Sequence, residues 1–193
     1  RLAPERPLVP LDSAQRVAVL GLSALIVGMD GFGWHRRLHM LAPMLTLPEP
    51  PEMIVRLGDK YGWSAQAHAA ATGRVQAICA HLDETMARQA EAGSDYLVGS
   101  CVTAVDFYWA SFAAMLKPLP HADCPMPDYM RKSYETAEAD TLACLTPRLE
   151  ALLVHWGVDG ARGPLLVIDP DNLAWGVLTE RDRQTLARRI PEL

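Results

Sequence analysis

Residues 93–112, GSDYLVGSCVTAVDFYWASF, decide the fold of this chain. Thr103 and Asp106 are spaced as the N-cap and third residue of a helix. The threonine oxygen can accept an amide hydrogen bond there, and the aspartate can accept one from the Thr103 amide. Residues 107–115 are almost wholly apolar, which predicts a central helix covered on every side. We assign Thr103 and Asp106 to helix capping rather than to catalysis, because capping already explains their types and positions.

Two helices are predicted immediately before this segment. A short one runs from Glu52 to Tyr61 and ends near Gly62, and a longer one runs from Ser64 to about Ala92 and is stopped by Gly93. Apolar residues recur at helical spacing in the longer helix and predict its buried stripe: Val75, Ile78, Leu82 and Met86.

The N-terminal residues predict a linker followed by a helix. Residues 1–11 contain three prolines, which lack backbone donors and favour extended chain, so we expect a linker. Asp12 is a suitable N-cap, and Gln15 completes a possible capping box. Apolar residues then follow at helical spacing and predict one apolar face: Val17, Leu20, Ala24 and Val27.

Glycine and proline predict the breaks that follow the first helix. Gly28 and Gly31 are expected to interrupt or bend it before residues 32–41, FGWHRRLHML, resume the helical pattern. Residues 43–51 contain four prolines and predict a loop. Over residues 12–157 no alternating strand pattern occurs, so we expect an all-α fold, a bundle of five or more helices.

The C-terminal third is less uniform. Residues 128–144 have a helical pattern, and Thr146 with Pro147 forms an N-cap followed by a first-turn proline. The helix that starts there should end at Gly157. Residues 161–178 are ambiguous between a short strand and packed coil.

Composition excludes some classes of function. The net charge of -5 over 193 residues argues against a nucleic-acid surface, which usually carries a basic excess. No uninterrupted apolar run reaches the roughly 18 residues of a membrane span, and residues 1–11 have no signal-peptide core. We therefore expect a cytoplasmic protein without a membrane partner. The four cysteines form no CxxC pair, so we expect reduced, mostly buried thiols.

The segment YLVGSCVTAVDFYWASF resembles the C-terminal domain of the glutathione transferase family. In that family a Gly-x-x-x-T-x-x-D-x-x-x-A-like pattern starts the central helix. The matching positions in this chain are Gly99, Thr103, Asp106 and Ala110. The likeness covers roughly residues 1–157. It implies a helical bundle of the glutathione transferase C-terminal type over residues 12–157, after the linker at 1–11. Residues 158–193 are an extension of uncertain origin.

The resemblance also implies a function. A thioredoxin-like half, not visible in this chain, would bind glutathione as co-substrate and supply the activating group. This chain itself then needs no cofactor and holds no catalytic residue, and a homodimer is expected. Joined to that half, it would help conjugate glutathione to an electrophilic small molecule. The alternative is a non-catalytic helical module that binds a partner protein or an apolar ligand.

By the same resemblance, this domain would form the wall of the pocket for a hydrophobic co-substrate. Candidates from the end of the first helical segment and from the central helix are Trp34, Arg37, Leu38, Leu41 and Phe112. Pockets for apolar ligands have such linings, although side chains of this kind also pack in cores.

A metal site is not predicted. His35 and His39 lie four residues apart, as two ligands on one helix face would. However, no Glu follows His35, and the spacing indicates no third ligand.

Overall fold

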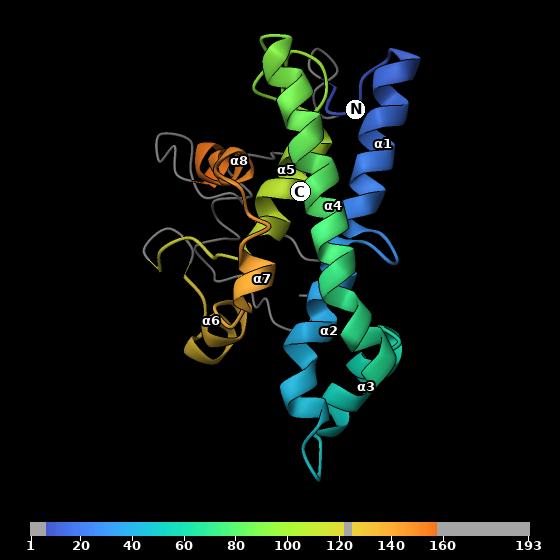
Figure 1. Ribbon diagram of the computed structural model, residues 1–193, viewed down its shortest axis with the longest axis vertical. Helices are drawn as coiled ribbons and strands as arrows, with labels where there is room; N and C mark the ends of the chain where they lie inside the picture. The colour runs from blue at the N-terminus through green and yellow to red at the C-terminus, as the bar shows by residue number, and fades with distance from the viewer. Residues whose placement is uncertain (1–6, 122–124, 158–193) are drawn as a thin grey trace, which may run out of the picture.

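The computed structural model describes residues 7–121 and 125–157, and every regular element in this part of the chain is a helix. The prediction of an all-α fold is confirmed. Figure 1 shows the elements: α1 (Ser13–Val27), α2 (Phe32–Leu45), α3 (Glu52–Lys60), α4 (Ala65–Glu91), α5 (Ala104–Ala113), α6 (Asp128–Tyr134), α7 (Ala139–Leu142) and α8 (Pro147–Gly157). The predictions for residues 158–193, including the ambiguous stretch at 161–178, lie outside the described residues.

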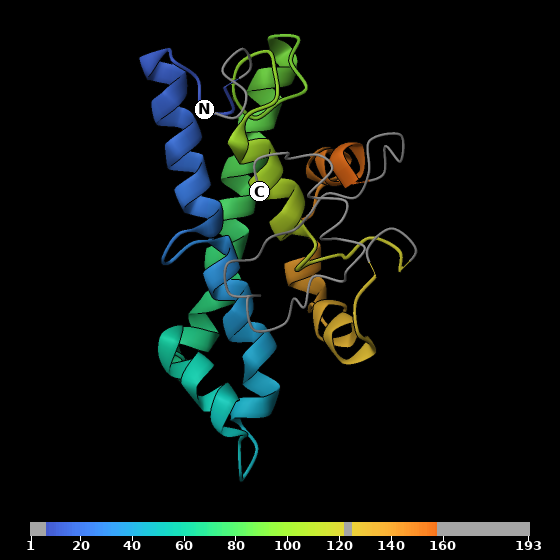
Figure 2. The ribbon, with the colours of Figure 1, turned by 180° about the vertical axis from the view of Figure 1, so that it is seen from behind.

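The helices are arranged around α4 and α5. The long α4 runs beside α1 at one end of the molecule and beside α2 at the other, with α3 packed on α2 (Figure 1). Helix α5 packs on α1 along one side and on α8 along the other (Figure 2). Its Trp109 is fully buried, lies edge-on to Phe32 with ring centroids 5.4 Å apart, and donates from Nε1 to the Leu149 carbonyl oxygen at 3.0 Å. Residues from all four of α1, α4, α5 and α8 therefore share one core.

Most predicted helix starts are confirmed because they depend on local capping. The Asp12 carboxylate accepts from the Gln15 amide at 2.9 Å, and the Ser64 hydroxyl accepts from the Ala67 amide at 3.0 Å. Thr146 precedes Pro147 as predicted and accepts from the Leu149 amide at 3.3 Å. Each bond satisfies one of the amides that a helix leaves unpaired in its first turn.

The apolar face predicted for α1 is not the face that packs in the core. Val17 is 73 % exposed and Leu20 is 50 % exposed, and Ala24 and Val27 are exposed as well. The residues that are buried instead lie one or two positions away: Val19, Leu22, Ser23 and Ile26. This helix is apolar on both faces, so spacing alone could not decide which face would meet α5.

Two predicted boundaries are also wrong. Helix α2 continues through Pro43 to Leu45, so the predicted loop over 43–51 begins only after it. A proline costs most when it interrupts many turns, and Pro43 comes in the last turn. The single helix predicted over 128–144 is two helices, α6 and α7, separated by residues 135–138.

The predicted capping box at the start of α5 is confirmed. Asp106 is fully buried, and its carboxylate accepts from the Thr103 amide at 2.7 Å and the Thr103 hydroxyl at 2.9 Å. It also accepts from the amide of Leu97 at 2.8 Å, which ties the preceding loop to the helix. The helix is not covered on every side, however, because Tyr108 is 42 % exposed.

Replacing Thr103 with alanine is expected to lower the free energy of unfolding by about 0.5 to 2 kcal/mol, the usual effect of losing an N-cap side chain. The Asp106 carboxylate would keep its bonds to the two backbone amides, so the loss should stay within that range. Urea denaturation measures it. An unchanged midpoint would contradict the role of the Thr103 hydroxyl.

One segment passes a length and composition test for a membrane span. Ser13–Leu45, which comprises α1 and α2, contains an 18-residue window with a mean hydropathy of 1.7, of which 39 % is buried inside the structure. Apolar core helices pass the same test. Here the segment is divided at residues 28–31, where Asp30 has a φ of 61°.

Candidate functional site

Four of the five side chains predicted to line a ligand pocket lie around Tyr61, which is buried at the end of α3, whereas Phe112 belongs to the main core. Leu38 and Leu41 are buried in the same apolar cluster as Tyr61. The ring of Trp34 lies edge-on to Tyr61, with centroids 5.0 Å apart. These residues therefore form a packed cluster between α2 and α3, with Trp34 half-buried at its edge.

Arg37 joins this cluster to α5. Its guanidinium carbon lies 5.3 Å from the centre of the Tyr61 ring and 5.6 Å from that of Phe112. Both distances are in the range of cation–π attraction. Gly33 makes the approach of Phe112 possible, because a Cβ at that position would lie 2.3 Å from the Phe112 ring. Arg37 and Trp34, both half-buried, are the members of the set that a ligand could reach.

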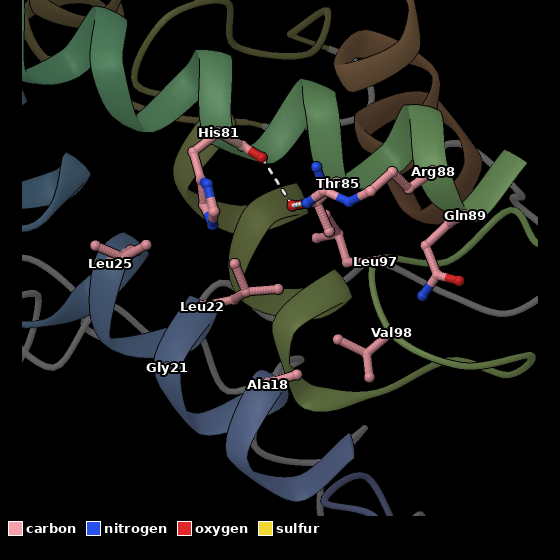
Figure 3. A pocket seen from close by; sticks show the side chains of 10 residues that line it. All are labelled: Ala18, Gly21, Leu22, Leu25, His81, Thr85, Arg88, Gln89, Leu97 and Val98. Atoms are coloured by element: carbon pink, nitrogen blue, oxygen red, sulfur yellow. Dashed lines mark hydrogen bonds between the residues drawn. The ribbon is translucent and has the colours of Figure 1, made fainter. Parts of the chain in front are cut away.

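A pocket of about 520 Å³ lies elsewhere, between α1, α4 and the loop before α5 (Figure 3). One side is apolar and comes from α1 and the loop, and the other is polar and comes from α4. The lining residues are Ala18, Gly21, Leu22, Leu25, His81, Thr85, Arg88, Gln89, Leu97 and Val98. The sequence analysis did not single these residues out. The available signal was Ala18 and Gly21, one turn apart, which leave space beside α1.

The polar wall of this pocket is internally hydrogen-bonded. Arg88 donates to the Thr85 hydroxyl at 3.0 Å, and that hydroxyl donates to the His81 carbonyl oxygen at 2.8 Å. Figure 3 shows the second of these bonds, with Leu22 and Val98 on the opposite side. An occupant with an apolar body and an acceptor group would match both walls.

A buried polar network joins α2 to α4 and to the residues just after α5. Arg36 is 1 % exposed and donates two hydrogen bonds, at 3.1 and 2.8 Å, to the Met115 carbonyl oxygen just after α5. Its third nitrogen lies 3.0 Å from Nδ1 of His39, whose Nε2 is 3.3 Å from the Thr72 hydroxyl. Burial lowers the pKa of Arg36 to about 10, so the side chain stays charged at neutral pH.

His35 and His39 do not converge on one point. Nε2 of His35 lies 2.8 Å from the carboxylate of Asp30, whereas His39 faces Arg36 and Thr72. Over residues 7–121 and 125–157, no group of three or more His, Cys, Asp and Glu side chains has an arrangement that could hold a metal ion.

Acidification is expected to destabilise the fold through His39. Burial, with the positive charge of Arg36, lowers the pKa of His39 to about 4. Because the unfolded chain then binds the proton more tightly, stability falls as pH drops from about 6.5 to about 4. After allowance for solvent screening of this half-exposed group, the loss is about 1 to 2 kcal/mol. Urea denaturation of the wild type and of His39→Gln at several pH values isolates this contribution. A stability difference between them that does not change with pH would contradict it.

The described residues thus offer a half-exposed aromatic and cationic surface on α2, a mixed pocket between α1 and α4, and a buried Arg36 network. Compared with protein-family models, with curated proteins and with solved structures, the chain matches none.

Proposed function

We propose that residues 12–157 form a helical domain of the glutathione transferase C-terminal type. The observation that carries the proposal is the Asp106 carboxylate, which joins the amides of Leu97 and Thr103 at the start of a buried helix. The other pattern positions also have physical reasons. Gly99 has a φ of +72°, which favours glycine, and Ala110 is buried where α5 packs.

The corresponding activity is conjugation of glutathione to an electrophilic small molecule, with a thioredoxin-like half binding glutathione as co-substrate. In this proposal the surface formed by Trp34 and Arg37 contacts the electrophile. The Trp34 ring and the Arg37 guanidinium suit a flat, electron-poor molecule with an anionic or polar group. The protein would act in the cytoplasm.

The coding sequence upstream of Arg1 provides the first test. An in-frame thioredoxin-like domain with an activating Ser, Tyr or Cys is the expected result, and a start codon close to Arg1 would overturn the enzymatic proposal. In the complete protein, Arg37→Ala should raise KM for the electrophile several-fold and leave KM for glutathione unchanged. Arg16→Ala, at an exposed position on α1, is the matched control.

This chain alone should not bind glutathione, because the groups that recognise the tripeptide in the resembled family lie in the thioredoxin-like domain. Isothermal titration calorimetry of the purified chain with glutathione measures this directly. Saturable binding in the micromolar range would contradict the assignment of glutathione recognition to another domain.

The pocket between α1 and α4 favours a second candidate, a non-catalytic module that binds an amphipathic small molecule. Gly21 lines the pocket with open space beside it, so Gly21→Leu should partly fill the cavity. Gly73→Leu places the same side chain at an exposed position of α4, also with open space, and is the matched control. Titration with the fluorescent probe anilinonaphthalene sulfonate should show weaker binding for Gly21→Leu only. Equal binding by both variants would exclude this pocket as the probe's site.

The exposed apolar face of α1 supports a homodimer. Val17, Leu20 and Val27 lie at helical spacing on that face and are 73 %, 50 % and 39 % exposed. Two copies of such a face can pack on each other about a two-fold axis. Light scattering should detect a dimer, and Leu20→Glu should yield a monomer. A wild-type monomer at high concentration would contradict the proposal.

A further inference from the structure

The pocket between α1 and α4 is bounded by two facing rows of side chains. Both rows have the spacing i, i+4, i+7, so each lies on one face of its helix and extends about 10 Å along the helix axis. The rows are Ala18, Leu22 and Leu25 on α1, and His81, Thr85 and Arg88 on α4. Figure 3 shows Leu25 and His81 at one end of the pocket, with Val98 and Gln89 at the other. The volume of about 520 Å³ is within the usual range for ligand pockets.

The charge of this pocket is opposite in sign to that of the whole chain. The chain has 23 acidic and 18 basic side chains, yet none of the described residues that line the pocket is acidic, and Arg88 belongs to its polar wall. Glu84 and Glu91, one turn before and one turn after Arg88, are exposed and lie outside the lining. In the part of the chain that the structure describes, no carboxylate oxygen comes within 4.0 Å of the Arg88 guanidinium. Arg88 thus brings a positive charge to the pocket without a counter-ion from these residues.

The Arg88 guanidinium is held in place and still has donors to offer. Its Nη2 donates to the Thr85 hydroxyl at 3.0 Å, and that hydroxyl donates to the His81 carbonyl oxygen at 2.8 Å. These two bonds keep the guanidinium beside the polar wall (Figure 3). A guanidinium has five N–H donors, and over residues 7–121 and 125–157 the structure gives one of them a partner. The remaining donors suit a carboxylate, which can accept two parallel hydrogen bonds from one guanidinium.

We propose that this pocket binds a single-chain carboxylate, a molecule with one carboxylate and a straight apolar chain. The carboxylate accepts from the remaining N–H groups of Arg88, and the chain lies along the apolar row of α1, where Gly21 leaves open space. The proposal rests on the second candidate function, binding of an amphipathic molecule in this pocket, and adds the charge of the head group and the residue that holds it. Burial of the chain supplies most of the affinity, and Arg88 selects the head group.

Calorimetric titration of the chain with octanoate, octanol and octylammonium tests the proposal, because the three probes share one apolar chain and differ in head group. Octanoate should bind about fivefold more tightly than octanol, the upper end for an ion pair at an exposed arginine. Octylammonium should bind more weakly than octanol, because its charge has the same sign as that of Arg88. Added sodium chloride should reduce the advantage of octanoate over octanol, since salt screens exposed charges.

Three variants assign the contacts. Arg88→Gln should weaken octanoate binding about fivefold and leave octanol binding unchanged. Arg56→Gln removes the same charge from an exposed position on α3 and should behave as the wild type. Gly21→Leu narrows the pocket and should weaken the binding of octanoate and octanol alike. Circular dichroism of each variant checks that it is folded, and the comparison of probes and salt concentrations on the wild type needs no variant.

The outcomes separate this inference from the candidate function on which it rests. If Gly21→Leu weakens both octanoate and octanol but Arg88→Gln changes neither, the pocket binds an amphipathic molecule and the assignment of its head group to Arg88 is overturned. The same conclusion follows if octanol binds the wild type as tightly as octanoate does. If neither probe binds, or if Gly21→Leu leaves both affinities unchanged, the candidate function of the pocket fails together with the inference.

Discussion

Replacing Asp106 with alanine is expected to lower the free energy of unfolding by about 3 to 5 kcal/mol. This exceeds an ordinary capping effect, because the carboxylate accepts from two backbone amides, those of Leu97 and Thr103, and from the Thr103 hydroxyl. Each buried donor left without a partner costs about 1 to 3 kcal/mol. Urea denaturation followed by circular dichroism measures the loss. Asp95→Ala, at an exposed position in the preceding loop, should change stability by no more than about 0.5 kcal/mol.

Asp106→Asn separates the shape of this side chain from its charge. Burial raises the pKa of Asp106, opposed by the hydrogen bonds it accepts, so the native state favours the protonated form more than the unfolded chain does. Protonation of Asp106 therefore contributes fully to the free energy of unfolding at pH values below the unfolded pKa. That contribution is lost as pH rises through the raised folded pKa. The stability advantage of wild type over Asp106→Asn should therefore narrow with rising pH over that window.

The prediction for Asp106→Ala has its own contradicting outcome. A loss below about 1 kcal/mol for Asp106→Ala would show that water replaces the carboxylate.

Trp109→Ala is expected to cost about 3 to 5 kcal/mol, the range for truncating a large buried aromatic side chain. The substitution removes the edge-on contact with Phe32 and leaves the Leu149 carbonyl oxygen without its indole donor. The structure around the cavity belongs to several helices, so it cannot collapse easily. The midpoints of thermal unfolding and of urea unfolding should both be lower than in the wild type.

Two variants control for this result. Trp109→Phe keeps most of the volume and loses the indole hydrogen bond, so it should cost about 1 to 3 kcal/mol. Tyr108→Ala truncates the neighbouring aromatic residue, which is 42 % exposed, and should cost much less. If Trp109→Ala were no more destabilising than Tyr108→Ala, Trp109 would not be central to the core.

Predictions from the sequence succeeded where the cause is local. The starts of α1, α4, α5 and α8 depend on side chains within three residues of each amide, and the pattern of Ser, Thr and Asp residues contains that information. The buried stripe of α4 was also predicted correctly, because polar residues occupy its other faces. In α1 both faces are apolar, and only the positions of α4 and α5 decide which one is buried.

The candidate sites required information that no local pattern contains. The pocket between α1 and α4 depends on how closely two helices approach, which small residues permit but do not determine. The cluster around Tyr61 combines residues of α2 with the end of α3, and the sequence indicated its members on α2 but not its centre.

The anchoring of α5 also has a consequence for how the chain folds. Its partners are remote: the Leu8 carbonyl oxygen bonds the Ala104 amide, Arg36 bonds Met115 across 79 residues, and Trp109 bonds Leu149 across 40. Helical proteins usually fold fast because their contacts are close in sequence. Contacts between distant residues slow folding, because the entropy of closing a long loop is lost before the contacts that compensate for it have formed. On a ribosome, α5 can form early but can dock fully only after residue 149 has left the exit tunnel. Until then its apolar surface needs protection from aggregation.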